Sequence, residues 1–450
     1  MFRLLLYWRP SLLRLSLGAL LIFVSALVGG LLACQVPTFW IVPAAAALAV
    51  LPFLRYVMPF YRFARATWRL RTVAGERVVL RYAAELDGRS EVEHCLKHGN
   101  EALTAFSDQF GYALRRRLVI FLFPTPMNAS RIFKSPYGGF ALIGGDAIGV
   151  CADGMPGARL DEVILHEVAH LYSAGLGDLQ PDLKGEGLAT WLMGSVDGKP
   201  IDFHALVALL SGRYLFLTWL LVPAWFANSR PDSYYLAGSF TGHLLARFGW
   251  ARYREFFKRA RSKGFETTFA QIFGLSLFAA ERQWRDALLE RKHTLEPELS
   301  RFVAQRSVEA AYEAGHAYRF LQDVEALSHA GQADGKMLTY AAAMHMYLGH
   351  YNAAATALQQ ALASNDVWIR AARGACWLRL GNVYDLLAQR ERAIQGYQQA
   401  LAEPDDWYGA LNSTHALARH YLKRPFTESE ILAELRPRTN NARRWRLRRR

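Results

Sequence analysis

A five-residue segment in the middle of the chain has the residue types and spacing of a hydrolytic zinc site. It reads His-Glu-Val-Ala-His and places His166 and His170 four positions apart, with Glu167 after the first histidine. On a helix such histidines project from one face, so both imidazoles can bind one Zn²⁺ at about 2.0–2.1 Å. Zinc lowers the pKa of a bound water toward about 7, and an adjacent carboxylate can take its proton. The segment predicts zinc as the cofactor, His166 and His170 as ligands, and Glu167 as the general base.

A third ligand is available at Glu186, sixteen residues after His170. Residues 184–191, Lys-Gly-Glu-Gly-Leu-Ala-Thr-Trp, resemble the Glu-Gly-Leu-Ala helix of the gluzincin metallopeptidases, in which the glutamate is the third zinc ligand. Two histidines and one carboxylate leave the fourth zinc position open, as a catalytic site requires. The alternative is that the histidines are surface or core residues and Glu186 is a solvated acid at a helix start.

The resemblance extends to residues 235–239, Tyr-Leu-Ala-Gly-Ser. They look like the Tyr-x-Lys-Gly-Ala segment of gluzincin aminopeptidases, where the tyrosine hydroxyl donates to the oxyanion of the tetrahedral intermediate. By that match Tyr235 is the expected oxyanion stabiliser. Tyr234 is the nearest rival, and a packing role is the alternative for either tyrosine. The match covers roughly residues 75–260.

Two departures from the gluzincin pattern matter. Thermolysin-like members carry an aspartate four residues after the third ligand, which orients a ligand histidine, and here that position is Thr190. The histidine support must then be made differently, or the metal is held less firmly. The glycine-rich residues 138–145 lack the glutamate with which the aminopeptidases hold a substrate amine. This argues against aminopeptidase action, although the stretch could pair as an edge strand with an extended peptide.

The elements that must position these residues can be predicted from periodicity and from glycine and proline positions. We expect Gly175 to end the helix that carries His166 and His170. The very apolar residues 205–226 are interpreted as a buried helix pair broken at Ser211-Gly212 and Pro223, with a membrane span as the alternative. The predicted elements are strands at 77–83 and 118–123, a hairpin at 138–150, and helices at 89–110, 159–174 and 185–194.

The N-terminal end has the composition of a membrane anchor. Forty residues between Arg14 and Arg55 carry no charge, which is enough for two helices of about 20 apolar residues each. We expect spans at about 15–34 and 39–58. Arginines flank the pair on both sides, so the positive-inside rule places the following domains in the cytoplasm of a protein integral to a bacterial inner membrane. A cleaved signal sequence or a single span is the alternative.

Residues 301–435 have the texture of helical repeats. Trp377, Leu380, Gly381 and Tyr384 fit the opening signature of a tetratricopeptide repeat, and a weaker copy precedes them at an offset of 39 residues. Such units stack on their neighbours and present a peptide-binding groove, so we expect a protein partner here. A plain helical bundle is the alternative.

The formal charge of +14 is concentrated at the two ends. Residues 1–71 and 436–450 contain eight arginines each and no acid, so the part between them carries about −2. A near-neutral folded part argues against nucleic acid as a partner. On a membrane-tethered protein the Arg-rich tail suits anionic lipid, with RNA or no partner as alternatives. The four scattered cysteines form no Cys-x-x-Cys pair, which excludes a cysteine-rich zinc site.

These observations predict an α+β zincin-like metallopeptidase domain over residues 72–300, preceded by a transmembrane helical hairpin within residues 1–71. An all-α tetratricopeptide-like region follows at 301–435, and then the tail at 436–450. The predicted function is membrane-anchored zinc endopeptidase activity on a peptide or protein substrate. One alternative is an adaptor at the membrane, in which the repeats act and the metal site is inactive or structural. An intact Glu167 favours the enzyme, since a structural site does not need that carboxylate. Hydrolysis of a non-peptide amide is a further alternative.

Overall fold

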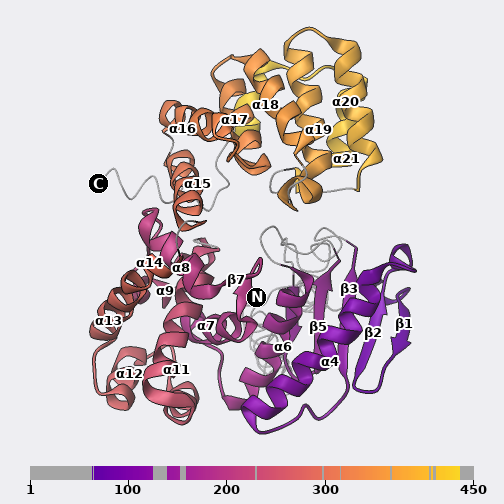
Figure 1. The fold of residues 1–450 in the computed structure, drawn as a ribbon. Coiled ribbons are helices and arrows are strands. Elements are labelled where there is room, and N and C mark those ends of the chain that lie inside the picture. Colours follow the sequence, from indigo (N-terminus) through magenta and orange to yellow (C-terminus); the bar gives the residue numbers. More distant parts are fainter. Residues whose placement is uncertain are drawn as a thin grey trace, which may run out of the picture. The chain divides into compact units, whose positions relative to one another are not determined.

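The chain divides into two compact units. Residues 1–154 together with 163–172 form the first unit, and 155–162 together with 173–450 form the second. In the described part the chain is mostly helical, with one small mixed sheet (Figure 1). The computed structural model describes residues 63, 65–124, 139–152, 159–228, 231–295, 298–314, 316–364, 367–404, 407–408 and 412–435.

The first unit is built on a five-stranded sheet with the strand order β1-β2-β3-β5-β4. The pairs β2–β3 and β3–β5 are parallel, whereas the edge strands β1 and β4 run antiparallel to their neighbours. The predicted strands and the glycine-rich hairpin are confirmed as β2, β3 and the pair β4–β5. The strands are β1 (Arg71–Ala74), β2 (Val78–Tyr82), β3 (Leu118–Phe123), β4 (Gly139–Leu142) and β5 (Ala147–Cys151).

Both faces of this sheet bury apolar side chains, which is why β3 is a continuous apolar run. On one face, helix α4 (Ser90–Phe110) approaches so closely that a Cβ added at Gly99 would lie 2.8 Å from the Ile120 side chain. On the other face, Phe121 lies against Phe63, with ring centroids 5.0 Å apart. Successive residues of a strand point to opposite faces, so one strand supplies both layers.

Helix α6 (Leu160–Leu176) lies beside α4 and carries the two predicted histidine ligands. Its Tyr172 ring packs on Phe106 and Phe110, and the Tyr172 hydroxyl donates to the Leu103 carbonyl at 3.2 Å. The predicted helix is confirmed, but its predicted end is wrong. Gly175 lies within the last turn, and the helix continues through the buried Leu176.

In the second unit, helix α7 (Asp182–Met193) packs against helix α11 (Asp232–Arg259) through small residues. A Cβ at Gly187 would lie 2.9 Å from the Ala237 carbonyl oxygen, and one at Gly238 would lie 2.7 Å from the Thr190 methyl. Around this pair lie the hairpin β6 (Ser195–Val196) and β7 (Lys199–Pro200), and helices α8 (Ile201–Leu210), α9 (Leu217–Leu220), α10 (Pro223–Asn228), α12 (Phe265–Phe273), α13 (Leu277–Glu290) and α14 (Lys292–Leu295).

The apolar residues 205–226 fold into α8, α9 and α10, with breaks after Leu210 and before Pro223. Most apolar side chains of α8 are buried, as are Leu217 and Leu220 of α9. The segment therefore forms three short helices rather than the predicted pair. Helix α8 is buried as predicted, whereas Phe216, Trp219 and Val222 are 43–47% exposed.

Across the described residues, no helix combines the length and apolar character that a membrane crossing demands. This finding contradicts the predicted fold class and the predicted integral-membrane localisation, and we correct both: the described chain is a mostly helical protein with a small mixed sheet. The expected spans at 15–34 and 39–58, and the tail at 436–450, lie outside the described residues.

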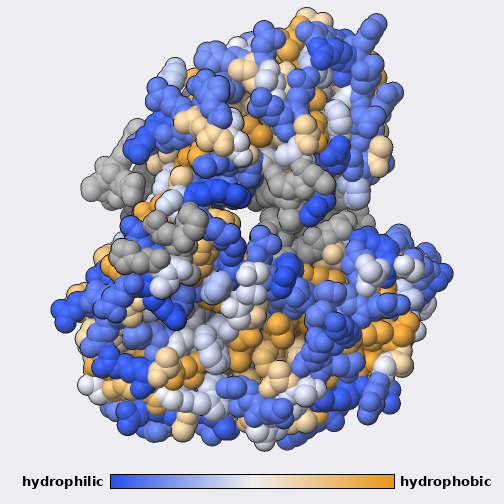
Figure 2. Space-filling model, viewed as in Figure 1, coloured by the Kyte–Doolittle hydropathy of each residue, from blue (hydrophilic) through white to orange (hydrophobic). Residues whose placement is uncertain are grey.

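The C-terminal part of the second unit is a series of helical hairpins. Its helices share one buried apolar cluster in which the repeat-signature residues Leu380, Tyr384 and Tyr397 take part. In Figure 2 the visible face of these helices is mostly hydrophilic, with apolar residues showing in scattered places. The helices are α15 (Glu298–Glu313), α16 (Ala317–His329), α17 (Gly335–Tyr347), α18 (Tyr351–Ala363), α19 (Val367–Leu386), α20 (Arg390–Ala402), α21 (Thr414–Lys423) and α22 (Glu428–Leu435), with a short hairpin of β8 (Trp407–Tyr408) and β9 (Asn412–Ser413) before α21.

Candidate metal centre

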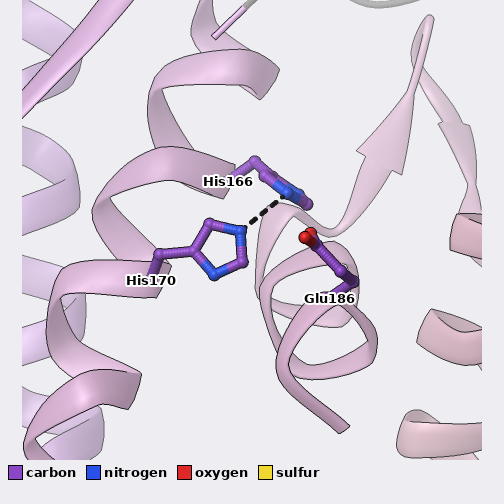
Figure 3. A group of neighbouring side chains, drawn as sticks. All are labelled: His166, His170 and Glu186. Atoms are coloured by element: carbon purple, nitrogen blue, oxygen red, sulfur yellow. Dashed lines mark hydrogen bonds between the residues drawn. The ribbon is translucent and has the colours of Figure 1, made fainter. Parts of the chain in front are cut away.

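His166, His170 and Glu186 lie together, with one potential ligand atom from each within 4.8 Å of the others. The Nε2 atoms of the two histidines are 3.2 Å apart. In Figure 3 both imidazoles project from one side of α6, and the Glu186 carboxylate extends toward them from α7. Within the described chain this is the one such group of three or more histidine, cysteine or acidic residues.

The donor set fits a zinc ion. Two nitrogens at about 2.0–2.1 Å from zinc, separated by a tetrahedral angle, would be about 3.3 Å apart, and the observed separation of 3.2 Å is close to this value. Two imidazoles with one carboxylate also form one of the ligand sets found in catalytic zinc sites. The same nitrogen and oxygen donors also suit other divalent transition metals.

The Gly-Glu-Gly sequence around the third ligand has a packing explanation. A Cβ at Gly185 would lie 2.3 Å from the Leu179 carbonyl oxygen, and one at Gly187 would clash with the Ala237 backbone of α11. Both flanking positions therefore exclude a side chain. Without side chains there, α7 packs closely against Leu179 and α11, and Glu186 is only partly exposed. A glycine pair that looks like a flexible motif in the sequence thus serves close helix packing.

The start of α7 is also anchored by a buried lysine. The Lys184 ammonium donates to the carbonyl oxygens of Phe257 and Ala260, at 3.1 and 2.7 Å. Burial lowers the pKa of Lys184 to about 7 because a low-dielectric surrounding disfavours the charged form. These contacts hold the α7 turn that carries Glu186 against the C-terminal end of α11.

Glu167, the predicted general base, lies on α6 with only 8% of its surface exposed. The edge strand β4 approaches it closely: a Cβ added at Gly139 would lie 2.6 Å from Glu167 Oε1 and 2.7 Å from Val163 Cγ1. The carboxylate is thus confined between its own helix and the backbone of the sheet edge.

Tyr235, the predicted oxyanion stabiliser, lies in the first turn of α11. Its ring packs on His204 of α8, with centroids 4.8 Å apart. Burial raises the pKa of the Tyr235 hydroxyl above its ordinary value, so the group stays protonated and able to donate. Its catalytic role remains a prediction.

Thr190 provides no charged support for a ligand histidine. Its side chain is fully buried, its hydroxyl has no hydrogen-bond partner in the described part of the chain, and its methyl packs against Gly238. Two other residues near the site were not identified from the sequence as functional. The sequence indicates only a first-turn acid at Glu162, yet this carboxylate is buried, and His204 is a partly buried histidine beside Tyr235. The one usable signal for Glu162 is its position one turn before His166.

No protein-family model matches this chain, and a search of curated proteins finds no match either. The resemblance to gluzincins therefore depends on the motif residues and on the geometry of the site.

Proposed function

We propose that this protein is a zinc-dependent hydrolase that cleaves peptide bonds. The observation that carries the proposal is the convergence of His166, His170 and Glu186, with Glu167 next to a ligand on the same helix. Three protein ligands from nitrogen and oxygen donors leave a coordination position for water or substrate, whereas structural zinc sites are usually closed by four protein ligands.

Zinc in this site would supply Lewis acidity, polarising a substrate carbonyl and lowering the pKa of a bound water. The residues of the chain have distinct tasks around it. Glu167 accepts the proton of the attacking water and later delivers it to the leaving amine, as a general base and then a general acid. The Tyr235 hydroxyl is proposed to donate to the carbonyl oxygen as charge develops there.

The sheet supports a peptide as the substrate class. Strand β4 ends the strand order, so within the described residues its outer edge pairs with no other strand. An extended peptide can add to such an edge through main-chain hydrogen bonds. Because Gly139 of β4 lies against Glu167, a peptide bound along β4 would pass close to the general base.

The test is hydrolysis of a mixed peptide library by the zinc-loaded wild-type chain and by the Glu167→Gln variant, followed by mass spectrometry. Glutamine keeps the size of the side chain but cannot accept the proton, so cleavage should fall by about 10²–10⁴-fold. Zinc content should be unchanged because Glu167 is not a ligand. Equal cleavage by both forms would contradict the proposal.

Tyr235→Phe is the second variant. Removing one donor to a developing oxyanion costs about 10²–10³-fold in kcat, and a loss in that range would support its assigned role. Tyr234→Phe is the matched control, since its ring packs on Phe226, with centroids 5.2 Å apart. A larger loss from Tyr234→Phe than from Tyr235→Phe would transfer the role to Tyr234.

A further inference from the structure

We propose that Glu162 is a positioning residue for the metal centre. Its carboxylate holds the β6–β7 hairpin, which directly follows α7, against the first turn of α6. The two helices that carry the metal ligands are thereby fixed at the spacing that lets them share one ion. The inference rests on the proposed metal-dependent function and extends it to a residue without contact to the metal.

Four hydrogen bonds fill the Glu162 carboxylate, whose side chain is 1% exposed. Oε1 accepts from the Ser195 hydroxyl at 2.8 Å and from the Gly198 N–H at 3.0 Å. Oε2 accepts from the Arg159 and Asp197 N–H groups, both at 2.9 Å. Hydrogen bonds to an ionised acceptor are about twice as strong as neutral ones, so this set can offset the cost of burying a carboxylate.

The hairpin turn is shaped to bind this carboxylate. Asp197 and Gly198 both have positive φ, 50° and 72°, which is the conformation of a two-residue type I′ turn. In this turn the two successive N–H groups both donate to Glu162. Asp-Gly is a favoured pair for this turn, so local sequence and the distant carboxylate specify the same backbone conformation.

The hydrogen bonds between Glu162 and the β6–β7 hairpin, here called the Glu162 clamp, join the two helices that carry the metal ligands. Glu162 lies one turn before His166 on α6, and the hairpin begins at Ser195, two residues after α7 ends at Met193. Between these points α7 carries Glu186. A shift of the hairpin away from Glu162 would therefore let α7 move relative to α6. Thr190 is buried and uncharged, so it cannot orient a ligand histidine as an aspartate would. The Glu162 clamp instead fixes the first turn of α6 to the hairpin that follows the end of α7.

The same hairpin also positions His204. The His204 Nε2–H donates to the Val196 carbonyl at 2.9 Å, and the His204 ring packs on Tyr235. One turn thus links the first turn of the histidine helix, the end of the glutamate helix and the proposed oxyanion donor.

The experiment measures zinc affinity by competition with a chromophoric chelator, on the whole chain. Glu162→Gln puts an amide donor where the hairpin offers only donors, so the clamp should open. We expect zinc to bind about 10–100-fold more weakly, the range typical for losing a residue that orients a metal ligand. Ser195→Ala, which removes a single donor, is the milder variant and should weaken zinc binding by a smaller factor.

Glu281→Gln is the matched control. Glu281 is also a buried carboxylate of the second unit, 3% exposed, and it accepts from the Leu217 N–H at 3.1 Å and from the Tyr214 hydroxyl. The Glu281→Gln variant should lose thermal stability as Glu162→Gln does, but its zinc affinity should be unchanged. Wild-type zinc affinity in Glu162→Gln, or an equal loss of affinity in Glu281→Gln, would overturn the inference. Failure of the wild-type chain to bind zinc would instead overturn the proposed function.

Discussion

The backbone of Gly139 lies directly against the carboxylate of Glu167. A methyl group at this position would approach Glu167 Oε1 to 2.6 Å and Val163 Cγ1 to 2.7 Å, which is closer than non-bonded carbon and oxygen atoms tolerate. The edge strand therefore fixes where the proposed general base can lie. A side chain at residue 139 must displace either the carboxylate or the strand.

We predict that Gly139→Ala lowers kcat/KM for peptide hydrolysis by about 10²-fold, since a displacement of about 1 Å in catalytic groups can cost that much. Zinc affinity should be retained, because the ligands are not touched. The measurement is steady-state hydrolysis beside zinc titration. Gly145→Ala is the control, with its nearest neighbour, the Leu142 carbonyl oxygen, at an ordinary 3.5 Å. Full activity in Gly139→Ala would show that the strand does not constrain Glu167.

His204 should make the stability of the protein depend on pH. Burial lowers its pKa below the ordinary 6.5, although the hydrogen bond to Val196 opposes the shift. In the unfolded chain His204 takes up a proton as pH falls through about 6.5, whereas in the folded chain it does so only at lower pH. The unfolded state then binds more protons, so the free energy of unfolding decreases as pH falls from about 6.5 through the folded-state pKa.

The check is urea unfolding of wild type and His204→Gln at pH 7.5 and pH 5.5. The variant should lose less stability between the two pH values than the wild type loses. His329→Gln, at a histidine whose side chain is 81% exposed, should behave like the wild type. An identical pH dependence in His204→Gln and wild type would exclude this contribution.

Arg306 joins the repeat helices to the helix that carries Tyr235. Its guanidinium bridges Asp232 of α11 and Glu309 of α15; Asp232 also pairs with Arg213 at 2.7 Å, and Glu309 with Lys336 of α17 at 2.7 Å. Asp232 and Glu309 are 2% and 7% exposed. Removing Arg306 would leave these acids with one partner each.

Arg306→Met should therefore lower the free energy of unfolding by at most about 3–5 kcal/mol, the range for a buried charge left without any partner, because Arg213 and Lys336 still pair with the two acids. Arg319→Met provides the comparison, because Arg319 is 74% exposed and lies 3.7 Å from Asp323; an exposed pair contributes at most about 1 kcal/mol. Chemical denaturation measures both. Similar small losses in the two variants would mean that the buried network does not stabilise the α11–α15 junction.

The elements set by local pattern were predictable from the sequence. The apolar run of β3 and the amphipathic α4 lie where periodicity places them, and the four-residue spacing of His166 and His170 put both on one face of α6. Predicting that Glu186 lies near the two histidines required one further assumption, namely that the two successive helices pack side by side. The short connection between α6 and α7 makes such packing common.

Features that depend on distant partners were not predictable. The four donors to Glu162 include three from residues 195–198, more than thirty positions away, and no local pattern records them. The end of α6 was misplaced at Gly175 because a glycine signal is local, whereas the burial of Leu176 favours a further residue of helix. The composition of the apolar segment 205–226 suits a protein core as well as a bilayer. Only its breaks at Ser211-Gly212 and Pro223 favour buried helices over a membrane span.

The most direct test of the metal centre is the zinc stoichiometry of the whole chain after equilibrium dialysis, for wild type and for His166→Ala, His170→Ala and Glu186→Gln. We predict one zinc per wild-type chain and affinity reduced by at least about 10²-fold in each variant, since each removes a ligand or its charge. Glu298→Gln, at a side chain that is 58% exposed, should bind zinc like the wild type. A wild-type chain without zinc, or a Glu186→Gln variant with undiminished affinity, would contradict the account.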